Sequence, residues 1–140
     1  MKFVALTLLA CSFAFVSVAQ EAPEKVDPTV AQGREWTQLF YQGELSKIYK
    51  LFTAEMQGTM TMDRFRQSRR QVSETLGVEK TLHDERVEKR EGGYLVYMRE
   101  ATFEKTSDRF RVIWAIRDGQ IGGFFIRPVD DALITPTPEG

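Results

Sequence analysis

From Tyr94 to Pro128, hydrophobic and polar residues alternate with a period of two, which is typical of strands with one buried face. Three strands are predicted in this stretch. The charged segment from Val78 to Arg90 is interpreted as another strand, which precedes them. Asp118-Gly119 separates two apolar runs and favours a tight hairpin turn, because this pair tolerates positive φ angles. The pattern therefore predicts a four-stranded antiparallel meander.

The alternation also assigns side chains to the two faces of this sheet. One face is strongly apolar and needs a cover; it includes Leu95, Tyr97, Ala101, Phe103, Phe110, Val112, Trp114, Ile116, Phe124 and Ile126. The opposite face mixes arginines with apolar residues, among them Tyr94, Val96, Met98, Ile113, Ala115, Ile121 and Phe125. The adjacent glycines Gly122-Gly123 predict a bulge or sharp bend in the last strand. Such a bend would half-close the sheet into a cone.

Helical spacing precedes the strands. Asp27-Pro28 is a typical helix start, and a mostly one-sided apolar stripe continues to about Tyr41, before Gln42-Gly43 ends the helix. The elements expected next are a short helix Glu44–Phe52, a connection Thr53–Thr59, and a third helix that Thr61 caps and Gly77 stops. The predicted fold is α+β, with N-terminal helices packed on a bent four-stranded antiparallel sheet in a cone-like, cystatin-like roll.

The first residues are typical of a secretory signal. Met1-Lys2 gives a positive start, an apolar run follows to Val18, and Ser17-Val18-Ala19 is a small-x-small cleavage site. Leu8-Leu9-Ala10-Cys11 also resembles the lipobox of bacterial lipoproteins, which would leave Cys11 as a lipidated N-terminus and is the only expected route to a membrane. Cleavage after Ala19 is favoured because the residues after Cys11 stay hydrophobic. The protein is expected to be secreted or periplasmic.

This division leaves a signal peptide at 1–19, a linker at 20–27, one domain at 28–128 and a tail at 129–140 that we expect to be mobile. Cys11 is the only cysteine, so the mature chain would carry no disulfide and no thiolate metal site. Removing Lys2 with the signal changes the net charge from −1 to −2. This near-neutral balance gives no reason to expect a nucleic-acid partner.

Three stretches carry a resemblance to a known family: FYQGELSKIYKLFTAEM, the helix from Thr61 to Gly77 ending in LG, and the strand pair WAIRDGQIGGFFIRP. With these residues the chain resembles the nuclear-transport-factor-2-like superfamily, also described as cystatin-like. Within it, the chain is most similar to the secreted family catalogued as domain of unknown function 3887. The resemblance implies a cone with a pocket between helices and sheet, and often dimers formed through the outer sheet face. It implies no activity.

Candidate acid–base chemistry is sparse. His83, the only histidine, stands beside Asp84, but neighbouring strand residues point to opposite faces, so a solvated outer strand is the favoured interpretation. Glu100 and Glu104 could form a carboxylate pair. Cross-strand salt bridges to nearby arginines are favoured instead, the candidates being Arg99, Arg109 and Arg111. No catalytic residue is assigned.

The third helix carries a basic cluster, which could hold an anion or an acidic partner but is favoured as a solvated helix face near Asp63 and Glu74; it consists of Arg64, Arg66, Arg69 and Arg70. One histidine and no mature cysteine give no reason to expect a metal site, and no cofactor motif is present.

The leading hypothesis is a non-enzymatic domain that binds a small apolar ligand or a partner protein, including a second copy of itself. The candidate ligand contacts, which are also typical of an ordinary core, are Trp36, Phe40, Tyr97, Trp114 and Phe124. The candidate interface residues are Met98, Ile113, Ile121 and Phe125. The alternative is a small-molecule lyase or isomerase. It needs a titratable side chain facing a cavity, with a second polar group in hydrogen-bond reach.

Overall fold

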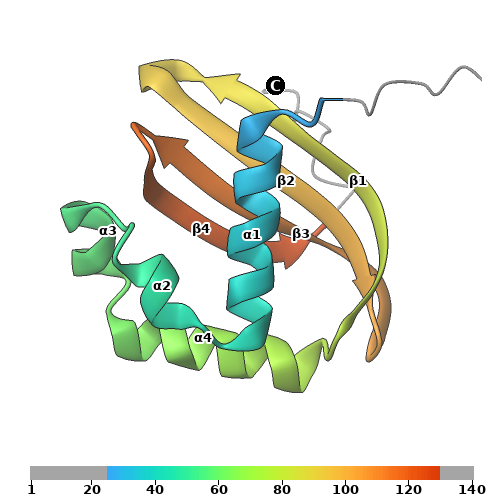
Figure 1. Cartoon of the computed structure of the whole chain (residues 1–140). Coiled ribbons are helices and arrows are strands. Elements are labelled where there is room, and N and C mark those ends of the chain that lie inside the picture. The colour runs from blue at the N-terminus through green and yellow to red at the C-terminus, as the bar shows by residue number, and fades with distance from the viewer. Residues whose placement is uncertain (1–24, 130–140) are drawn as a thin grey trace, which may run out of the picture.

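The computed structural model describes residues 25–129, so the predicted signal peptide and nearly all of the tail lie outside the described residues (Figure 1). The helices are α1 (Pro28–Gln42), α2 (Leu45–Tyr49), α3 (Ala54–Thr59) and α4 (Met62–Thr75). The strands are β1 (Glu79–Arg90), β2 (Tyr94–Phe103), β3 (Thr106–Arg117) and β4 (Gln120–Pro128), with a 3-10 turn, Glu91–Gly93, between the first two.

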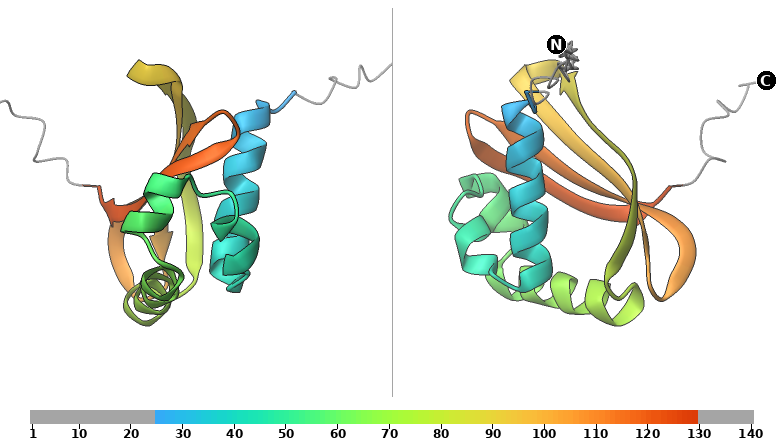
Figure 2. Two further views of the ribbon diagram at one scale, coloured as in Figure 1. Left: turned by 90° about the vertical axis from the view of Figure 1, so that its left-hand side faces the viewer. Right: turned by 45° about the vertical axis from the view of Figure 1, so that its right-hand side comes forward.

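The four strands form one antiparallel sheet in the order β1-β2-β3-β4, which confirms the predicted meander and the α+β class. Asp118 and Gly119 have φ angles of 51° and 73° between β3 and β4, the geometry that a tight primed hairpin turn requires. The sheet is strongly twisted and bent, and the helices lie against one of its faces and along one end (Figure 2). The arrangement has two layers.

Helix α1 begins and ends at the residues that the sequence indicates. The Asp27 carboxylate caps it by accepting a hydrogen bond of 2.7 Å from the amide of Thr29. Gly43, with φ of 80°, ends the helix in the left-handed conformation. The buried face of α1, which includes Trp36 and Phe40, packs on the sheet against Trp114 and Phe124. Helix α4 lies beneath the lower end of α1 and buries Phe65 (Figure 1).

The prediction of a plain connection at Thr53–Thr59 is wrong, because Ala54–Thr59 forms helix α3. The Thr53 hydroxyl caps it by accepting a hydrogen bond of 3.1 Å from the amide of Met56. Helix α2 is also shorter than expected and ends at Tyr49. The backbone just beyond it bonds to Ile121 of β4 instead, through Ile121 N to Leu51 O (2.8 Å) and Thr53 N to Ile121 O (3.0 Å). This pairing with β4, at the edge of the sheet, thus separates helix α2 from helix α3.

The assignment of Ile121 to the outer sheet face is also wrong. Ile121 pairs with Ile116, but Gly123 pairs with Ala115, so Gly122 is an extra residue in β4. The bulge that Gly122-Gly123 predicts is confirmed. The extra residue reverses the inward and outward alternation of side chains for the residues that precede Gly122. Ile121 consequently faces the helices, has no exposed surface, and belongs to the main core.

Candidate functional site

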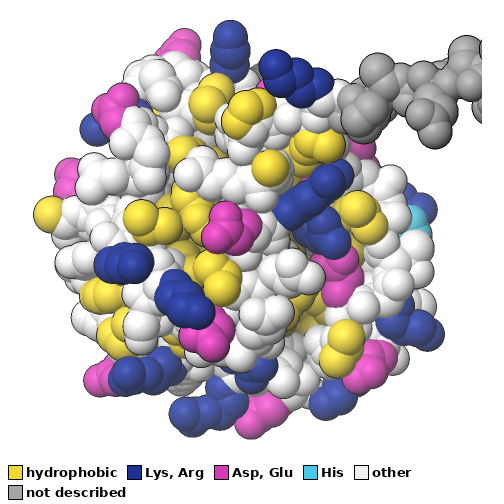
Figure 3. All heavy atoms as spheres, viewed as in Figure 1, with side chains coloured by type: hydrophobic (Ala, Val, Ile, Leu, Met, Phe, Trp, Pro, Cys, Tyr) yellow, Lys and Arg dark blue, Asp and Glu magenta, His cyan; other side chains and the backbone are white. Residues whose placement is uncertain are grey.

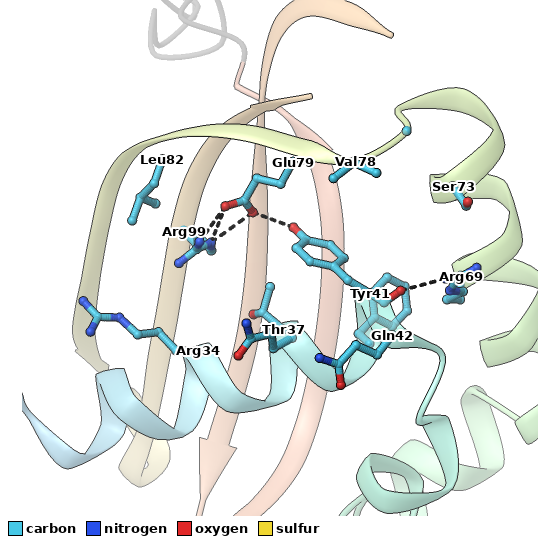
Figure 4. A pocket seen from close by; sticks show the side chains of 13 residues that line it. Arg34, Thr37, Tyr41, Gln42, Arg69, Ser73, Val78, Glu79, Leu82 and Arg99 are labelled. Atoms are coloured by element: carbon cyan, nitrogen blue, oxygen red, sulfur yellow. Dashed lines mark hydrogen bonds and ion pairs between the residues drawn. The ribbon is translucent and has the colours of Figure 1, made fainter. Parts of the chain in front are cut away.

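A pocket of about 520 Å³ lies between α1, α4 and the first half of β1 (Figure 4). Its polar lining comes from Arg34, Thr37, Gln38, Gln42, Arg69, Ser73, Glu79 and Arg99, and its other walls from Phe40, Tyr41, Gly77, Val78 and Leu82. Basic, acidic and apolar side chains meet on the surface between α1 and β1 (Figure 3).

Strand β1 contributes to this pocket because it is bulged twice. The register shifts between Glu79 and Thr81 and again between Leu82 and Asp84. As a result Glu79, Leu82 and Glu85 pair with Phe103, Ala101 and Arg99, residues that all lie on the helix side of β2. Inward-facing residues therefore recur every three positions here rather than every two.

The charged centre of the pocket is Arg99 of β2. Its Nε and Nη2 donate hydrogen bonds to the Glu79 carboxylate at 2.5 to 3.1 Å, and its Nη1 lies 3.2 Å from Glu85 Oε1. All three side chains are largely shielded from solvent, with exposed fractions of 17% for Arg99, 12% for Glu79 and 8% for Glu85. One guanidinium thus joins two carboxylates from the bulged strand.

Two tyrosines and a second arginine complete this network. The Tyr41 hydroxyl donates to Glu79 Oε2 at 2.8 Å, and the Tyr97 hydroxyl donates to Glu85 Oε1 at 2.6 Å. Arg34 of α1 donates to both oxygens of Glu85, the shortest bond being 2.5 Å. These contacts tie α1 to β1 and β2 through side chains rather than through backbone pairing.

The network moves the pKa values of Glu85, Tyr41 and Tyr97 away from neutral pH. Burial acts to raise the pKa of Glu85, but hydrogen bonds from Arg34 and Tyr97 and the charge of Arg99 outweigh it and lower the pKa. Burial raises the pKa of Tyr41, and the charge of Glu79 raises it further. Burial and the hydrogen bond to Glu85 raise the pKa of Tyr97. At neutral pH Glu85 is therefore ionised, while the two phenols are neutral.

Arg69 of α4 lies at the end of the pocket opposite to Arg34 (Figure 4). Its Nη2 donates a hydrogen bond of 2.7 Å to the carbonyl of Tyr41, in the last turn of α1. Within residues 25–129, no carboxylate lies within ion-pair distance of Arg69, in contrast to Arg34 and Arg99. Arg69 therefore brings a charge to the pocket that the neighbouring side chains do not offset.

Comparison with known proteins identifies the family. The profile of a family described as protein of unknown function (DUF3887) matches residues 34–124, more than half of the chain. The chain belongs to this family. No curated protein and no solved structure matches it, so placement in the wider nuclear-transport-factor-2-like superfamily stays a prediction.

The match to DUF3887 spans most of α1 and continues to Phe124 in β4. It therefore includes every charged residue of the pocket described above.

The five aromatic residues predicted as ligand contacts lie together, but they pack against one another. The exposed fraction is 0% for Tyr97, Phe40 and Trp114. It is 3% for Trp36 and 6% for Phe124. The Trp114 ring centroid lies 4.2 Å from that of Phe124 and 5.9 Å from that of Trp36. The Trp114 indole also donates to the buried Thr37 hydroxyl at 3.0 Å. These residues form the core of this DUF3887 domain, and of the five only Phe40 lines the charged pocket.

The four predicted interface residues do not form one exposed surface. Met98, Ile113 and Phe125 lie on the outer face, where Ile113 pairs with Met98 on one side and Phe125 on the other. Met98 and Ile113 are nevertheless only 5% and 6% exposed, whereas Phe125 is 58% exposed. Of this set, Phe125 alone offers a large apolar surface to a partner.

The candidate acid–base residues His83 and Glu100 lie outside the pocket. His83 is exposed and contacts the Thr102 hydroxyl at 3.2 Å on the outer side of the sheet. The expected cross-strand bridge of Glu100 is confirmed with Arg111, which lies opposite it in register. Arg99 does not share in it, because it faces the helices.

Among the described residues, no three His, Cys, Asp or Glu side chains gather in a way that could hold a metal ion. Within 25–129, no helix has the length and apolar content needed to cross a lipid bilayer.

Proposed function

We propose that this DUF3887 domain is an exported, non-enzymatic ligand-binding domain, and that its ligand site is the pocket between α1, α4 and β1. The observation that carries the proposal is a pocket of about 520 Å³ in which the charged side chains of Arg34, Glu79 and Arg99 are held in place by one ion-pair network. Small-molecule sites commonly enclose about 300–1,000 Å³ and use a few fixed polar groups for specificity. The export part of the proposal rests on the signal pattern of residues 1–19.

Binding accounts for the chemistry of the pocket better than acid–base catalysis does. An efficient general acid or base has a pKa near the working pH. Among the groups of the network, Tyr41 lines the pocket and its pKa is raised, while beside the pocket the pKa of Glu85 is lowered and that of Tyr97 is raised, so each shift moves the group away from that range. The network therefore suits a rigid, permanently charged surface.

One observation keeps a small-molecule lyase or isomerase as the second candidate. Glu79 faces the pocket, and the Tyr41 hydroxyl lies 2.8 Å from it, so the geometric requirement for a paired acid and base is met. Both Glu79 oxygens also accept hydrogen bonds from Arg99. A substrate would have to displace part of that pairing before the carboxylate could accept a proton.

The test is a thermal-denaturation screen of the purified protein against a library of small organic molecules, repeated with a variant that blocks the pocket. Ser73→Trp places an indole in the pocket from α4, while Gln67→Trp adds the same group to an exposed position of α4 outside it. Ligands that stabilise the wild type and Gln67→Trp, but not Ser73→Trp, would support the proposal. A screen without ligands, or ligands that bind Ser73→Trp equally well, would overturn it. Turnover of a ligand would favour the second candidate.

A further inference from the structure

The formal charges around the pocket do not cancel. Arg34, Arg69 and Arg99 of the lining contribute +3, whereas Glu79 of the lining and Glu85, the ion-pair partner of Arg34 and Arg99, contribute −2, which leaves +1. Close by, Glu104 and Lys105 lie beside Gly77 and carry opposite charges, so they leave this sum unchanged. The pocket is therefore matched by a ligand with a single negative charge.

The excess charge lies at the α4 end. Arg34 and Arg99 each pair with carboxylates, but the described partner of Arg69 is the Tyr41 carbonyl, which takes only one of the five N–H donors of a guanidinium. The bond to Tyr41 holds the planar guanidinium at the pocket wall and leaves other donors for a ligand. A carboxylate can accept two parallel hydrogen bonds from such a group.

The wall of the pocket on the β1 side, across from α1, is apolar and exposed. Val78 and Leu82 are 68% and 41% exposed, and they are two of the four large hydrophobic side chains that residues 25–129 leave open to solvent. Both line this pocket, and the double bulge in β1 turns Leu82 inward. Figure 4 shows both side chains on the β1 side, across from α1, with Arg69 at one end. A ligand with a short apolar part would cover them.

We propose that the pocket binds an amphiphilic monocarboxylate, with its carboxylate on Arg69 and its apolar part against Val78 and Leu82. This inference rests on the proposed ligand-binding function and names the chemical class of the ligand. A phosphate monoester offers the same hydrogen-bond acceptors but brings about −1.5 to −2 charges at neutral pH, more than the net charge of the pocket. The single charge and the planar fork of Arg69 favour the carboxylate.

The experiment is calorimetric titration of the purified protein with hexanoate, hexylamine and hexyl phosphate. Arg69→Gln removes the charge, and Arg70→Gln makes the same change at an exposed neighbour outside the pocket. Hexanoate is expected to bind the wild type more tightly than the other two probes. Arg69→Gln should weaken hexanoate by about tenfold, the loss expected for one charge-assisted pair, while Arg70→Gln leaves the Kd within about twofold.

A second variant tests the apolar half without touching Arg69. Val78→Ser changes an exposed side chain, so the fold should be unaffected, and it is expected to weaken hexanoate by about threefold while acetate binding stays unchanged. Equal losses in Arg69→Gln and Arg70→Gln, no binding of hexanoate, or equal or tighter binding of hexylamine or hexyl phosphate would overturn the inference.

The two proposals fail in different ways. If other ligands bind and Ser73→Trp blocks them while hexanoate does not bind, the ligand site stands and the carboxylate class is wrong. If Ser73→Trp leaves every ligand unaffected, both proposals are wrong.

Discussion

Gly33 in α1 lies directly against the ring of Tyr97 in β2: a Cβ atom built on Gly33 would stand 2.3 Å from Tyr97 Cγ. The ring has no exposed surface, and its hydroxyl is held by Glu85 at 2.6 Å. It cannot withdraw without giving up that bond. The close approach of α1 to the sheet, and with it the position of Arg34 over Glu85, therefore depends on a glycine inside a helix.

Gly33→Ala should destabilise the domain by about 2 kcal/mol through overpacking. The sign is informative, because alanine is otherwise favoured over glycine in helices by about 1 kcal/mol. Gly58→Ala in α3 is the matched control, since no heavy atom outside the immediate chain lies within 4 Å of a Cβ at that position. Urea unfolding of both variants measures the difference. An equal gain in stability from both would show that Tyr97 moves aside at little cost.

The ionisation of Glu85 should make stability depend on pH. Its pKa in the folded protein is lowered from the ordinary value of 4.5, so the unfolded chain binds the proton more readily. The stabilisation from Glu85 is therefore present above pH 4.5 and is lost as the pH falls through the folded-state pKa. The groups that face this carboxylate are Arg34, Tyr97 and Arg99.

Glu85→Gln isolates this effect. The free energy of unfolding of the wild type should exceed that of Glu85→Gln at pH 7, and the difference should shrink as the pH is lowered below 4.5. Glu91→Gln, at an exposed position without an ion pair within residues 25–129, should differ little from the wild type at either pH. A difference between wild type and Glu85→Gln that stays constant with pH would contradict the assignment.

The sheet and its cover could be predicted from the sequence because their signals are local. Asp118-Gly119 is a hairpin turn in its own right, and the alternation through β3 places Trp114 on the core face and Ile113 on the other. That alternation fails where the backbone is irregular. Gly122 indicates a bulge, but the sequence does not say which residue is the extra one, so simple alternation assigns Ile121 to the wrong face.

The pocket could not be predicted in this way. Two bulges in β1 turn Leu82 inward between Glu79 and Glu85 and keep Thr81 and His83 off the helix side, and no glycine in this stretch indicates those bulges. The sequence does carry one sign of the pocket: Arg99 lies between Tyr97 and Ala101 on the same, apolar face of β2. A guanidinium at an inward position needs carboxylate partners. Following that requirement would have pointed to the carboxylates of the preceding strand.

The outer sheet face can be tested for the predicted homodimer at Phe125. Phe125 is 58% exposed, so Phe125→Glu should change the free energy of unfolding by less than about 0.5 kcal/mol. It should convert a dimer to a monomer in sedimentation velocity, because the charge would be buried in the interface. Gln120→Glu, at the exposed start of β4, is the control and should leave the dimer intact. A monomeric wild type, or a dimer that Phe125→Glu leaves unchanged, would contradict the prediction.

Ile113 is unsuitable for that test, although it pairs directly with Phe125. Only 6% of its surface is exposed, so Ile113→Glu places an unpaired carboxylate in the packed layer of a single chain. We expect a loss of about 3 kcal/mol or more. Urea unfolding should therefore separate the two outer-face variants clearly. Equal stabilities of Ile113→Glu and Phe125→Glu would mean that Ile113 is as accessible as its neighbour.

The proposed export makes a prediction about the mature N-terminus. When the chain is expressed with residues 1–19 in a secretion-competent bacterium, we expect it outside the cytoplasm, beginning at Gln20. The small side chain of Ala19 fits the cleavage site, so Ala19→Arg should block processing. Cys11→Ser should have no effect, because Cys11 is removed with the signal. Intact-mass measurement after cell fractionation distinguishes the outcomes. A lipid-modified N-terminus at Cys11, lost in Cys11→Ser, would instead make the protein a membrane-anchored lipoprotein and bring the pocket to a membrane surface.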